Sequence, residues 1–297
     1  MSHASLYALN IILALMMFGI ALNLRLADFQ RVVRYPKGVV VGLITQFLAL
    51  PGLTFIATYY LPLPAEIELG LLLVASCPGG SFSNIMTYLA GGNAALSVTM
   101  TALASSLAAF FTPFNFILYS SLNPVTAPLM AEIAVPAEQI YAIVALVLAL
   151  PLLLGLAVGR WQSDWAAKVE PGFRYASLAA LYGFVAIAIW QNWQALQASA
   201  LIFIWAVIAH NLLALGLGYG ASRMVGLDVA DRRAVTFEVG LQNSGLGLGI
   251  IFTFFADLGG MAIVAAGWGI WHLISGMTLC GLWNRGDRRQ SATVESP

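Results

Sequence analysis

Long apolar stretches alternate with short polar connections along this chain. A transmembrane helix needs roughly 20 consecutive, mostly apolar residues to cross the hydrocarbon core of a bilayer. Stretches of that length predict nine transmembrane helices, at about 5–25, 37–61, 66–90, 94–119, 138–160, 174–192, 198–222, 230–256 and 259–284. The longer connection 120–137 is Pro-rich and is expected along the surface. The polar residues after Trp283 are expected to be disordered.

Two of these stretches are interrupted by glycine, proline and polar residues. The interruptions read CPGGSFSN over 77–84 and EVGLQNSG over 238–245. Proline and glycine do not continue a stable helix, so the carbonyls that precede them lose their helical partners. Irregular backbone at membrane depth is tolerated only inside protein or beside a water-filled cavity. Paired interruptions in corresponding positions of two half-sequences are typical of a transporter's binding site.

The composition indicates that lipid is the main solvent. Hydrophobic residues make up 60% of the 297 positions and charged residues only 9%, with a mean hydropathy of +0.86, whereas soluble domains carry about 25% charged residues. We therefore predict an all-α integral membrane protein in contact with membrane lipid. The zero formal net charge argues against nucleic acid as a partner. Cys77 and Cys280 both lie in apolar stretches and give no evidence of a disulfide.

The basic residues indicate an orientation. All 13 Lys and Arg fall on one side of the membrane if the chain crosses it nine times. They are expected in the connections after the first, fifth and seventh helices and in the tail: Arg25, Arg31, Arg34, Lys37, Arg160, Lys168, Arg174, Arg223, Arg232, Arg233, Arg285, Arg288 and Arg289. Positive residues mark the cytoplasmic face, so we expect the N-terminus outside and the C-terminus in the cytoplasm, in the inner (plasma) membrane.

The interruptions also predict an internal symmetry. If the third and eighth helices correspond, helices one to four match helices six to nine, and helix five has no partner. The third and eighth helices enter from opposite faces, so the repeats would be inverted.

Glu238 is the acidic residue that this pattern places near the middle of the membrane. A charge there costs at least about 2.5–3.5 kcal/mol, yet every Lys and Arg is expected in a connection. A bound cation is the simplest counter-charge; the alternative is a protonated, structural Glu238. The carbonyls of Val239 and Leu241 are expected to point away from the helix axis and to add oxygen ligands for a small cation.

Small polar side chains near the first interruption are further candidates. Ser81 and Ser83 are good N-cap residues for the half-helix that follows, and the positive end of a half-helix suits an anion. Asn84 lies beside them, and Ser97 and Thr101 are four apart on one helix face. Small polar residues also hold membrane helices together, but beside an interrupted helix ligation is the preferred interpretation.

Three polar residues within other apolar stretches are ambiguous. Gln46 is as well suited to an interhelical hydrogen bond as to ligation. His210 and His272 are single histidines, which are more often structural than functional.

The string CPGGSFSNIMTYLAGGNAALSVTMT, with EVGLQNSGLG and the final WHLISG, resembles the bile acid:sodium symporter family in its nine-helix, bacterial-type form. The resemblance covers nearly the whole chain, from Asn10 to about Trp283. It implies a single transporter domain over 1–297 in which two discontinuous helices cross. It further implies panel elements at about 5–25, 138–160 and 174–192, core elements at about 37–119 and 198–284, and a cytoplasmic tail at 285–297.

The resemblance also implies ligands. Two sodium ions, the only metal expected, would bind behind the crossover and an organic anion in front of it. The first ion would be held by Ser83, Asn84, Ser97, Thr101 and Glu238, and the second by Gln46, Glu238, Gln242 and the carbonyls of Val239 and Leu241. Ser81, Asn243 and His272 would face the substrate. Leu273 stands where close bacterial relatives often carry Asn, and Gly91-Gly92 replaces an Arg-Gly pair of some relatives.

These observations predict a sodium-coupled symporter of an organic anion, either a bile acid or a small carboxylate such as pantoate or pyruvate. The alternatives are a proton-coupled transporter and an oxyanion exporter of the same fold. An enzyme is not expected, because the sequence offers no acidic metal cluster, Ser-His-Asp arrangement or metal-binding His pair. The physiological substrate, the sodium stoichiometry and the oligomeric state stay open.

Overall fold

The computed structural model describes residues 11–22, with gaps at 13, 16 and 20, and then 36–133, 137–191 and 193–294. Its helices are α3 (Pro36–Ile44), the π-helix η2 (Thr45–Ala49), α4 (Leu50–Tyr60), α5 (Ala65–Ser76), α6 (Phe82–Leu89), α7 (Ala94–Leu122), α8 (Ala127–Ile133), α9 (Ala137–Trp161), α10 (Ser163–Gln191), α11 (Trp193–Met224), α12 (Val229–Gly240), α13 (Ser244–Phe254) and α14 (Gly259–Val294). In this part of the chain the one β-type pairing is an isolated antiparallel bridge between Gly79 and Gln242.

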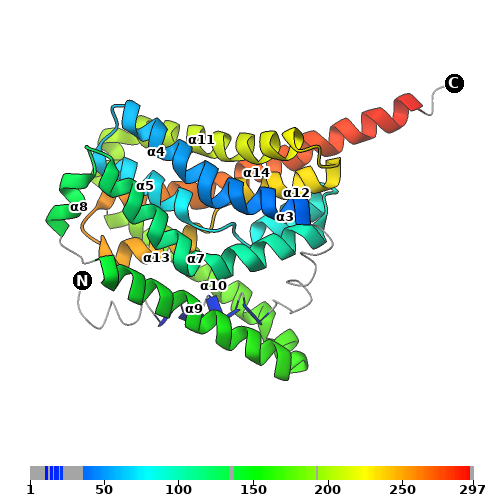
Figure 1. The fold of residues 1–297 in the computed structure, drawn as a ribbon, viewed down its shortest axis with the longest axis horizontal. Coiled ribbons are helices and arrows are strands. Elements are labelled where there is room, and N and C mark those ends of the chain that lie inside the picture. The colour runs from blue at the N-terminus through cyan, green and yellow to red at the C-terminus, as the bar shows by residue number, and fades with distance from the viewer. Residues whose placement is uncertain are drawn as a thin grey trace.

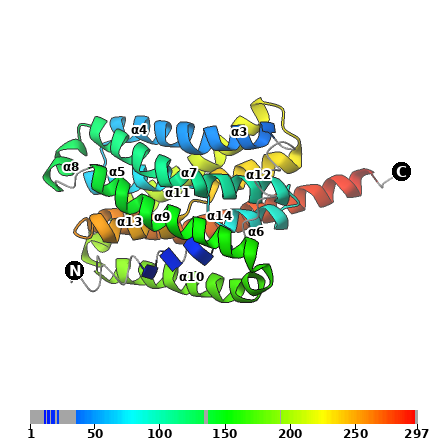
Figure 2. The ribbon, with the colours of Figure 1, turned by 60° about the horizontal axis from the view of Figure 1, so that its bottom comes forward.

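The helices lie in two groups. α9 and α10 lie together with the described N-terminal residues, and the other helices form the larger group (Figures 1 and 2). α9 packs against α7, and α10 packs against α14. Phe18 contacts Phe173 of α10 edge-on, with ring centroids 5.5 Å apart. The first predicted helix therefore belongs with α9 and α10, although most of its residues, and Arg25, Arg31 and Arg34 after it, lie outside the described residues.

The interrupted helices lie where the sequence predicts them. α5 and α6 fill the range 66–90 and are separated at 77–81, and α12 and α13 fill 230–256 and are separated at 241–243. Ten successive residues of α5, from Ile67 to Ser76, are buried, and most of them are apolar, as expected for a helix that is surrounded by other helices. This burial places the first interruption deep inside the protein.

Two helix bounds differ from the prediction because hydropathy detects only the apolar part of a helix. α10 begins at Ser163 rather than near residue 174. The prediction of a disordered tail after Trp283 is wrong up to Val294, because α14 continues to that residue.

The expectation that all basic residues lie in connections is wrong as well. Lys168 lies in α10, and Arg233 lies in α12, where it is buried.

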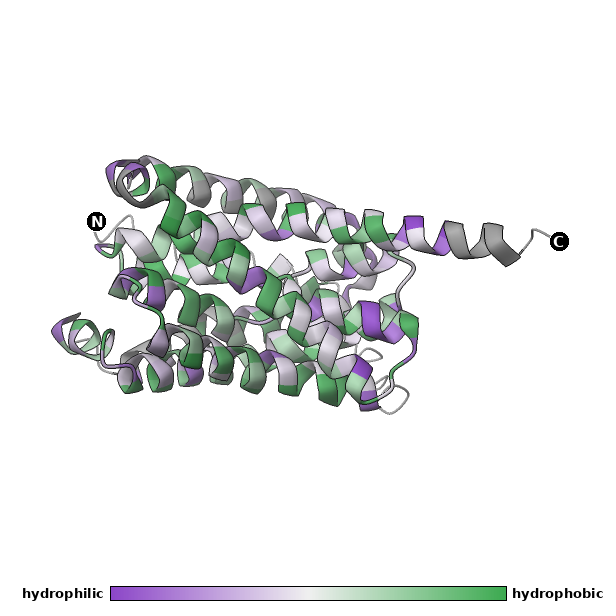
Figure 3. Ribbon diagram, turned by 90° about the horizontal axis from the view of Figure 1, so that it is seen from above, coloured by the Kyte–Doolittle hydropathy of each residue, from purple (hydrophilic) through white to green (hydrophobic). Residues whose placement is uncertain are grey.

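The surface carries many large apolar side chains. Ile44, Leu48, Leu201 and Trp205 are examples that are at least half exposed, and Figure 3 shows apolar residues along the whole length of the bundle. Among the described residues, four helical ranges are long and apolar enough to cross a membrane: Pro36–Tyr60, Ala94–Leu122, Ala200–Met224 and Gly259–Arg288. Such exposure exceeds what soluble monomers tolerate and fits a surface that faces lipid.

Candidate functional site

The two interruptions lie against each other and satisfy each other's backbone. The N–H of Gly80 donates to the carbonyl of Leu241 at 2.7 Å, and the N–H of Asn243 donates to the carbonyl of Pro78 at 2.9 Å. These bonds flank the Gly79–Gln242 bridge. Backbone groups freed by the breaks are thus paired inside the protein, as a lipid environment requires.

Two side chains complete this pairing at the ends of the helices. The carbonyl of Cys77, directly after α5, accepts a 2.7 Å bond from Nε2 of Gln46. The carbonyl of Gly240, the last residue of α12, accepts a 2.9 Å bond from Nδ2 of Asn211. The crossing is therefore held by neighbouring helices as well as by its own backbone.

Position 79 requires glycine because Glu238 lies very close to it. A Cβ there would lie less than 3.0 Å from both the carboxylate and the backbone oxygen of Glu238. Contacts that short occur essentially never for real Cβ atoms, so Gly79 allows the carboxylate to lie against the first interruption.

The carboxylate of Glu238 is the centre of the polar cluster. It is buried, and its Oε2 accepts hydrogen bonds from the hydroxyls of Ser83 at 2.6 Å and Thr101 at 2.8 Å. Its Oε1 is also buried and has no hydrogen-bond partner among the described residues. The carboxylate thus contacts both the half-helix α6 and the helix α7, with one oxygen still available.

The amide oxygen of Asn84 extends this cluster. It lies 2.8 Å from the hydroxyl of Ser97 and 3.2 Å from that of Thr101. One hydroxyl has one proton to donate, so Thr101 satisfies either Asn84 or Glu238 at a given moment, and oxygen acceptors outnumber the donors. The structure therefore brings together all five side chains of the first predicted ligand set.

Thr87 belongs to the same cluster and was missed by the sequence analysis. Its hydroxyl donates to Ser97 at 3.2 Å, and its side chain is fully buried. Thr87 follows Ser83 by four residues, so both lie on one face of α6. That spacing is the signal that could have identified it.

Gln46 and Gln242 form the second group. Their amides bond reciprocally, Nε2 of Gln46 to Oε1 of Gln242 at 2.9 Å and Nε2 of Gln242 to Oε1 of Gln46 at 3.2 Å. Gln46 lies in the π-helix η2, which sequence reasoning did not anticipate. π-turns inside α-helices occur frequently at functional sites.

A proline and an asparagine hold the region around Gln46 in place. Pro51 has no N–H, so it cannot bond the carbonyl of Phe47 four residues earlier. Nδ2 of Asn115 on α7 donates to that carbonyl at 2.8 Å instead. α7 thus supports the helix that carries Gln46.

The carbonyls of Val239 and Leu241 each have one partner. Val239 accepts a 2.7 Å bond from Nε2 of Gln242, and Leu241 accepts the bond from Gly80. A carbonyl oxygen has two lone pairs, so each retains one acceptor position.

The observed helix N-caps differ in part from those predicted from the sequence. Ser81 occupies the N-cap position of α6, but its side chain makes no capping bond and is exposed. Ser83 is not a cap: it lies within α6, which begins at Phe82, and its hydroxyl donates to Glu238. Asn243 is a true N-cap, and its Oδ1 accepts from the N–H of Leu246 at 3.1 Å.

The two membrane histidines have opposite environments. Nδ1 of His210 accepts from Trp268 at 3.0 Å, which leaves Nε2 as the protonated nitrogen and donor to Thr54, 2.8 Å away. Both nitrogens of buried His272 lack a hydrogen-bond partner among the described residues. Its ring lies 6.4 Å from that of Phe82, the neighbour of Ser81. His210 is structural, whereas His272 has two nitrogens available near the start of α6.

A second buried carboxylate, Glu68, was not singled out from the sequence. It lies in α5, is fully buried, and accepts a 2.8 Å bond from Nδ2 of Asn123. Both Glu66 and Glu68 lie in the first turn of α5, at the start of the third predicted helix.

Two interrupted helices that meet around a buried, oxygen-rich cluster define a class of helical membrane transport protein. Comparison with known proteins gives the family. A model of the sodium bile acid symporter family matches residues 10–199, and the chain belongs to this family.

Relatives extend the match beyond the second interruption. An uncharacterized sodium-dependent transporter, YocS of Bacillus subtilis, is 33% identical over 289 residues, 97% of this chain and 86% of its own. The probable sodium/metabolite cotransporter BASS1 of Oryza sativa is 32% identical over 90% of this chain and 63% of its own. The human ileal sodium/bile acid cotransporter is 30% identical over 80% of this chain and 67% of its own. All three relatives are named as transporters or cotransporters rather than enzymes, and sodium use is common to their names.

Proposed function

We propose that this protein is a sodium-coupled symporter that imports a small organic anion. The observation that carries the proposal is the carboxylate of Glu238, buried between hydroxyl groups with no ion pair in the described part of the chain. A buried charge without a counter-charge is costly, and a bound sodium ion would supply one.

The first sodium ion is assigned to Ser83, Asn84, Ser97, Thr101 and Glu238. The donor set fits, because every candidate atom is an oxygen and hard cations prefer oxygen ligands. The acceptors exceed the available protons, and Oε1 of Glu238 has no other partner. On cation binding the hydroxyl protons would turn away from the carboxylate towards other acceptors.

The second sodium ion is assigned to Gln46, Glu238, Gln242 and the carbonyls of Val239 and Leu241. Two observations support this assignment: each carbonyl has a spare acceptor position, and the amides of Gln46 and Gln242 contact each other. Glu238 would be a ligand of both ions, so the two sites would adjoin at its carboxylate. Two ions are thus proposed.

The anion is assigned to the start of α6 and α13, with Ser81, Asn243 and His272 in contact. A half-helix N-terminus carries partial positive charge. The unpartnered nitrogens of His272 would donate or accept at the same place. A bile acid and small carboxylates such as pantoate or pyruvate remain candidates, and the first of these is the substrate named for the ileal relative.

The proposal includes nine transmembrane helices in two inverted repeats. Two matching contacts support the repeats. Oε2 of Glu66, in the first turn of α5, accepts from the N–H of Gly260 at the start of α14. Oδ1 of Asp231, in the first turn of α12, accepts from Nδ2 of Asn93 at the start of α7. Each interrupted helix is thus tied to the start of the helix after its counterpart.

The domain division and the orientation are proposed as well. α9, α10 and the first helix would form the panel that moves against the remaining core, which agrees with their grouping in Figure 2. The N-terminus would lie outside and the C-terminus in the cytoplasm, with the protein in the inner (plasma) membrane.

Proton coupling through the same site is the second candidate. The observation that favours it is again Oε1 of Glu238, because a proton would neutralise the carboxylate as a cation does. An oxyanion exporter of the same fold is the third.

Uptake of labelled anions into proteoliposomes separates these functions. At fixed pH, an inward sodium gradient should drive accumulation of one anion class, and replacement of sodium by choline should abolish it. Accumulation that follows an imposed pH gradient without sodium would favour proton coupling. Efflux without uptake would favour the exporter.

A further inference from the structure

The C-terminal end of α6 is fixed by groups from distant parts of the chain. Helix ends leave carbonyls without intrahelical partners. Gly92 donates to the carbonyl of Thr87 at 2.8 Å and Gly91 to that of Tyr88 at 3.1 Å. This Schellman-type closure requires the positive φ of 65° at Gly91. The carbonyls of Leu89 and Ala90 are left for other donors.

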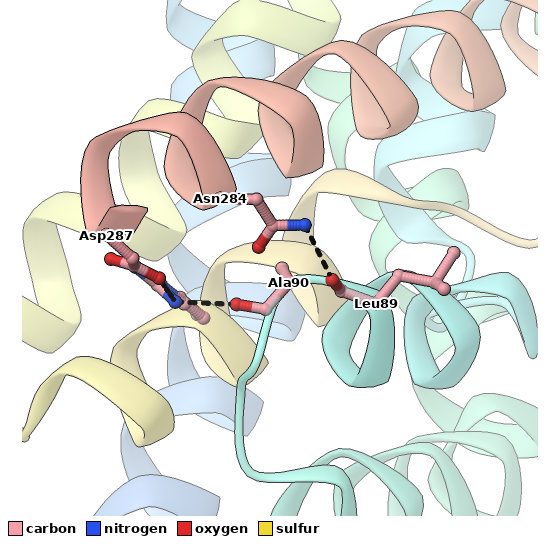
Figure 4. Close-up of polar contacts among 5 residues, drawn as sticks. Leu89, Ala90, Asn284 and Asp287 are labelled. Carbon is pink, nitrogen blue, oxygen red and sulfur yellow. Dashed lines mark hydrogen bonds and ion pairs between the residues drawn. The ribbon is translucent and has the colours of Figure 1, made fainter. Parts of the chain in front are cut away.

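Those donors come from α14 and α12. Nδ2 of Asn284 donates to the carbonyl of Leu89 at 2.9 Å, and Nη1 of Arg233 donates to that of Ala90 at 2.6 Å. Figure 4 shows both bonds, with the end of α6 held beneath α14. A cationic donor at the C-terminal end of a helix is also favoured by the helix dipole.

Asp287 holds Arg233 in position. Its two carboxylate oxygens accept from Nη1 and Nη2 of Arg233 at 2.8 and 2.7 Å. Such bidentate pairs fix the guanidinium plane. The side chain of Arg233 is only 10% exposed, and its guanidinium lies over the ring of Trp283 at 5.3 Å. Loss of Asp287 would therefore leave a largely buried charge without its anion.

α6 depends on such support because it is short. It has eight residues, and a helix of that length is not stable on its own. Ser83 and Asn84 lie in its first turn, and Thr87 follows in the next. A shift at its C-terminal end therefore displaces the hydroxyl and amide oxygens that lie around Glu238.

We propose that Asn284 and Asp287, on the C-terminal part of α14, are positioning residues that set the sodium affinity of the site at Glu238. The C-terminal part of α14 thus holds the C-terminal end of α6 in place. Asn284 contacts α6 directly, and Asp287 acts through Arg233. This inference rests on the proposed sodium coupling and adds residues outside both ligand sets.

The test is a sodium titration of the purified protein in detergent, read as the thermal unfolding midpoint and compared among variants. In Asn284→Ala/Asp287→Ala the half-saturating sodium concentration should rise about tenfold, equivalent to about 1.4 kcal/mol. The single variant Asp287→Glu preserves a carboxylate for Arg233 and should keep most of the sodium affinity that the double variant loses. Arg288→Ala, one residue further along and exposed, is the matched control and should stay within about twofold of the unaltered protein, well below that tenfold change.

Three other results would overturn the proposal in distinguishable ways. Equal half-saturating concentrations and equal midpoints without sodium in the double variant and the unaltered protein would show that Asn284 and Asp287 affect neither sodium binding nor stability. A lower midpoint without sodium but an unchanged titration would show a purely structural role. Absence of any sodium response in the unaltered protein would instead refute the proposed function on which this inference rests.

Discussion

The hydroxyl of Ser83 donates a 2.6 Å hydrogen bond to the carboxylate of Glu238, a residue 155 positions further along the chain. The bond connects the half-helix after the first interruption with the helix before the second. It therefore places the one carboxylate of the cluster where both candidate ligand sets meet.

Close approach at Gly79 gives the first prediction. Gly79→Ala should lower the free energy of unfolding by about 1–3 kcal/mol, because the new methyl group overlaps the carboxylate and backbone of Glu238. Thermal unfolding in detergent measures this. Gly216→Ala on α11, where a Cβ meets nothing within 4 Å, is the control and should be neutral or slightly stabilising. Equal midpoints for both variants would contradict the close contact.

The carbonyl of Phe47 gives the second prediction. Asn115→Ala should cost about 1–3 kcal/mol, since it leaves that buried carbonyl unpaired. Pro51→Ala supplies a backbone N–H four residues after Phe47, so the same Asn115→Ala change should cost less in that background. A double-mutant cycle of unfolding free energies measures the difference. An identical cost in both backgrounds would show that Asn115 does not serve this carbonyl.

The two histidines give the third prediction. His210→Phe should destabilise the protein by about 1–3 kcal/mol, because the indole N–H of Trp268 loses its acceptor. His272→Phe breaks no hydrogen bond within the described structure and should leave the unfolding midpoint nearly unchanged. It should instead raise the KM for anion uptake about three- to tenfold, the loss of one net hydrogen bond. Uptake kinetics and unfolding curves of the two variants should therefore show opposite patterns.

The sequence predicts the interruptions and Glu238 because their signals are local. Proline and glycine end helices wherever they occur in an apolar stretch, and an isolated carboxylate in such a stretch needs a counter-charge. Gln46 was identifiable for the same reason. Its π-helix was not, and neither was the bond that Asn115 donates from another helix to Phe47 within that π-helix.

The missed residues depend on contacts between distant segments. Asn284 and Asp287 were assigned to a disordered tail, since polar composition alone does not separate a solvated helix from a coil. Their roles follow from bonds to Leu89 and Arg233, which sequence spacing does not reveal. Arg233 looked like a loop residue for the same reason: only the tertiary structure shows the carbonyl and carboxylate that allow its burial.

Sodium binding at Glu238 is the central claim, and a sodium titration of thermal stability tests it most directly. The unfolding midpoint of the unaltered protein should rise with sodium, but not with potassium or choline at equal ionic strength. In Glu238→Ala, and in Glu238→Gln, which preserves the side-chain volume, the midpoint should no longer respond to sodium. A sodium response in either variant equal to that of the unaltered protein would contradict the account.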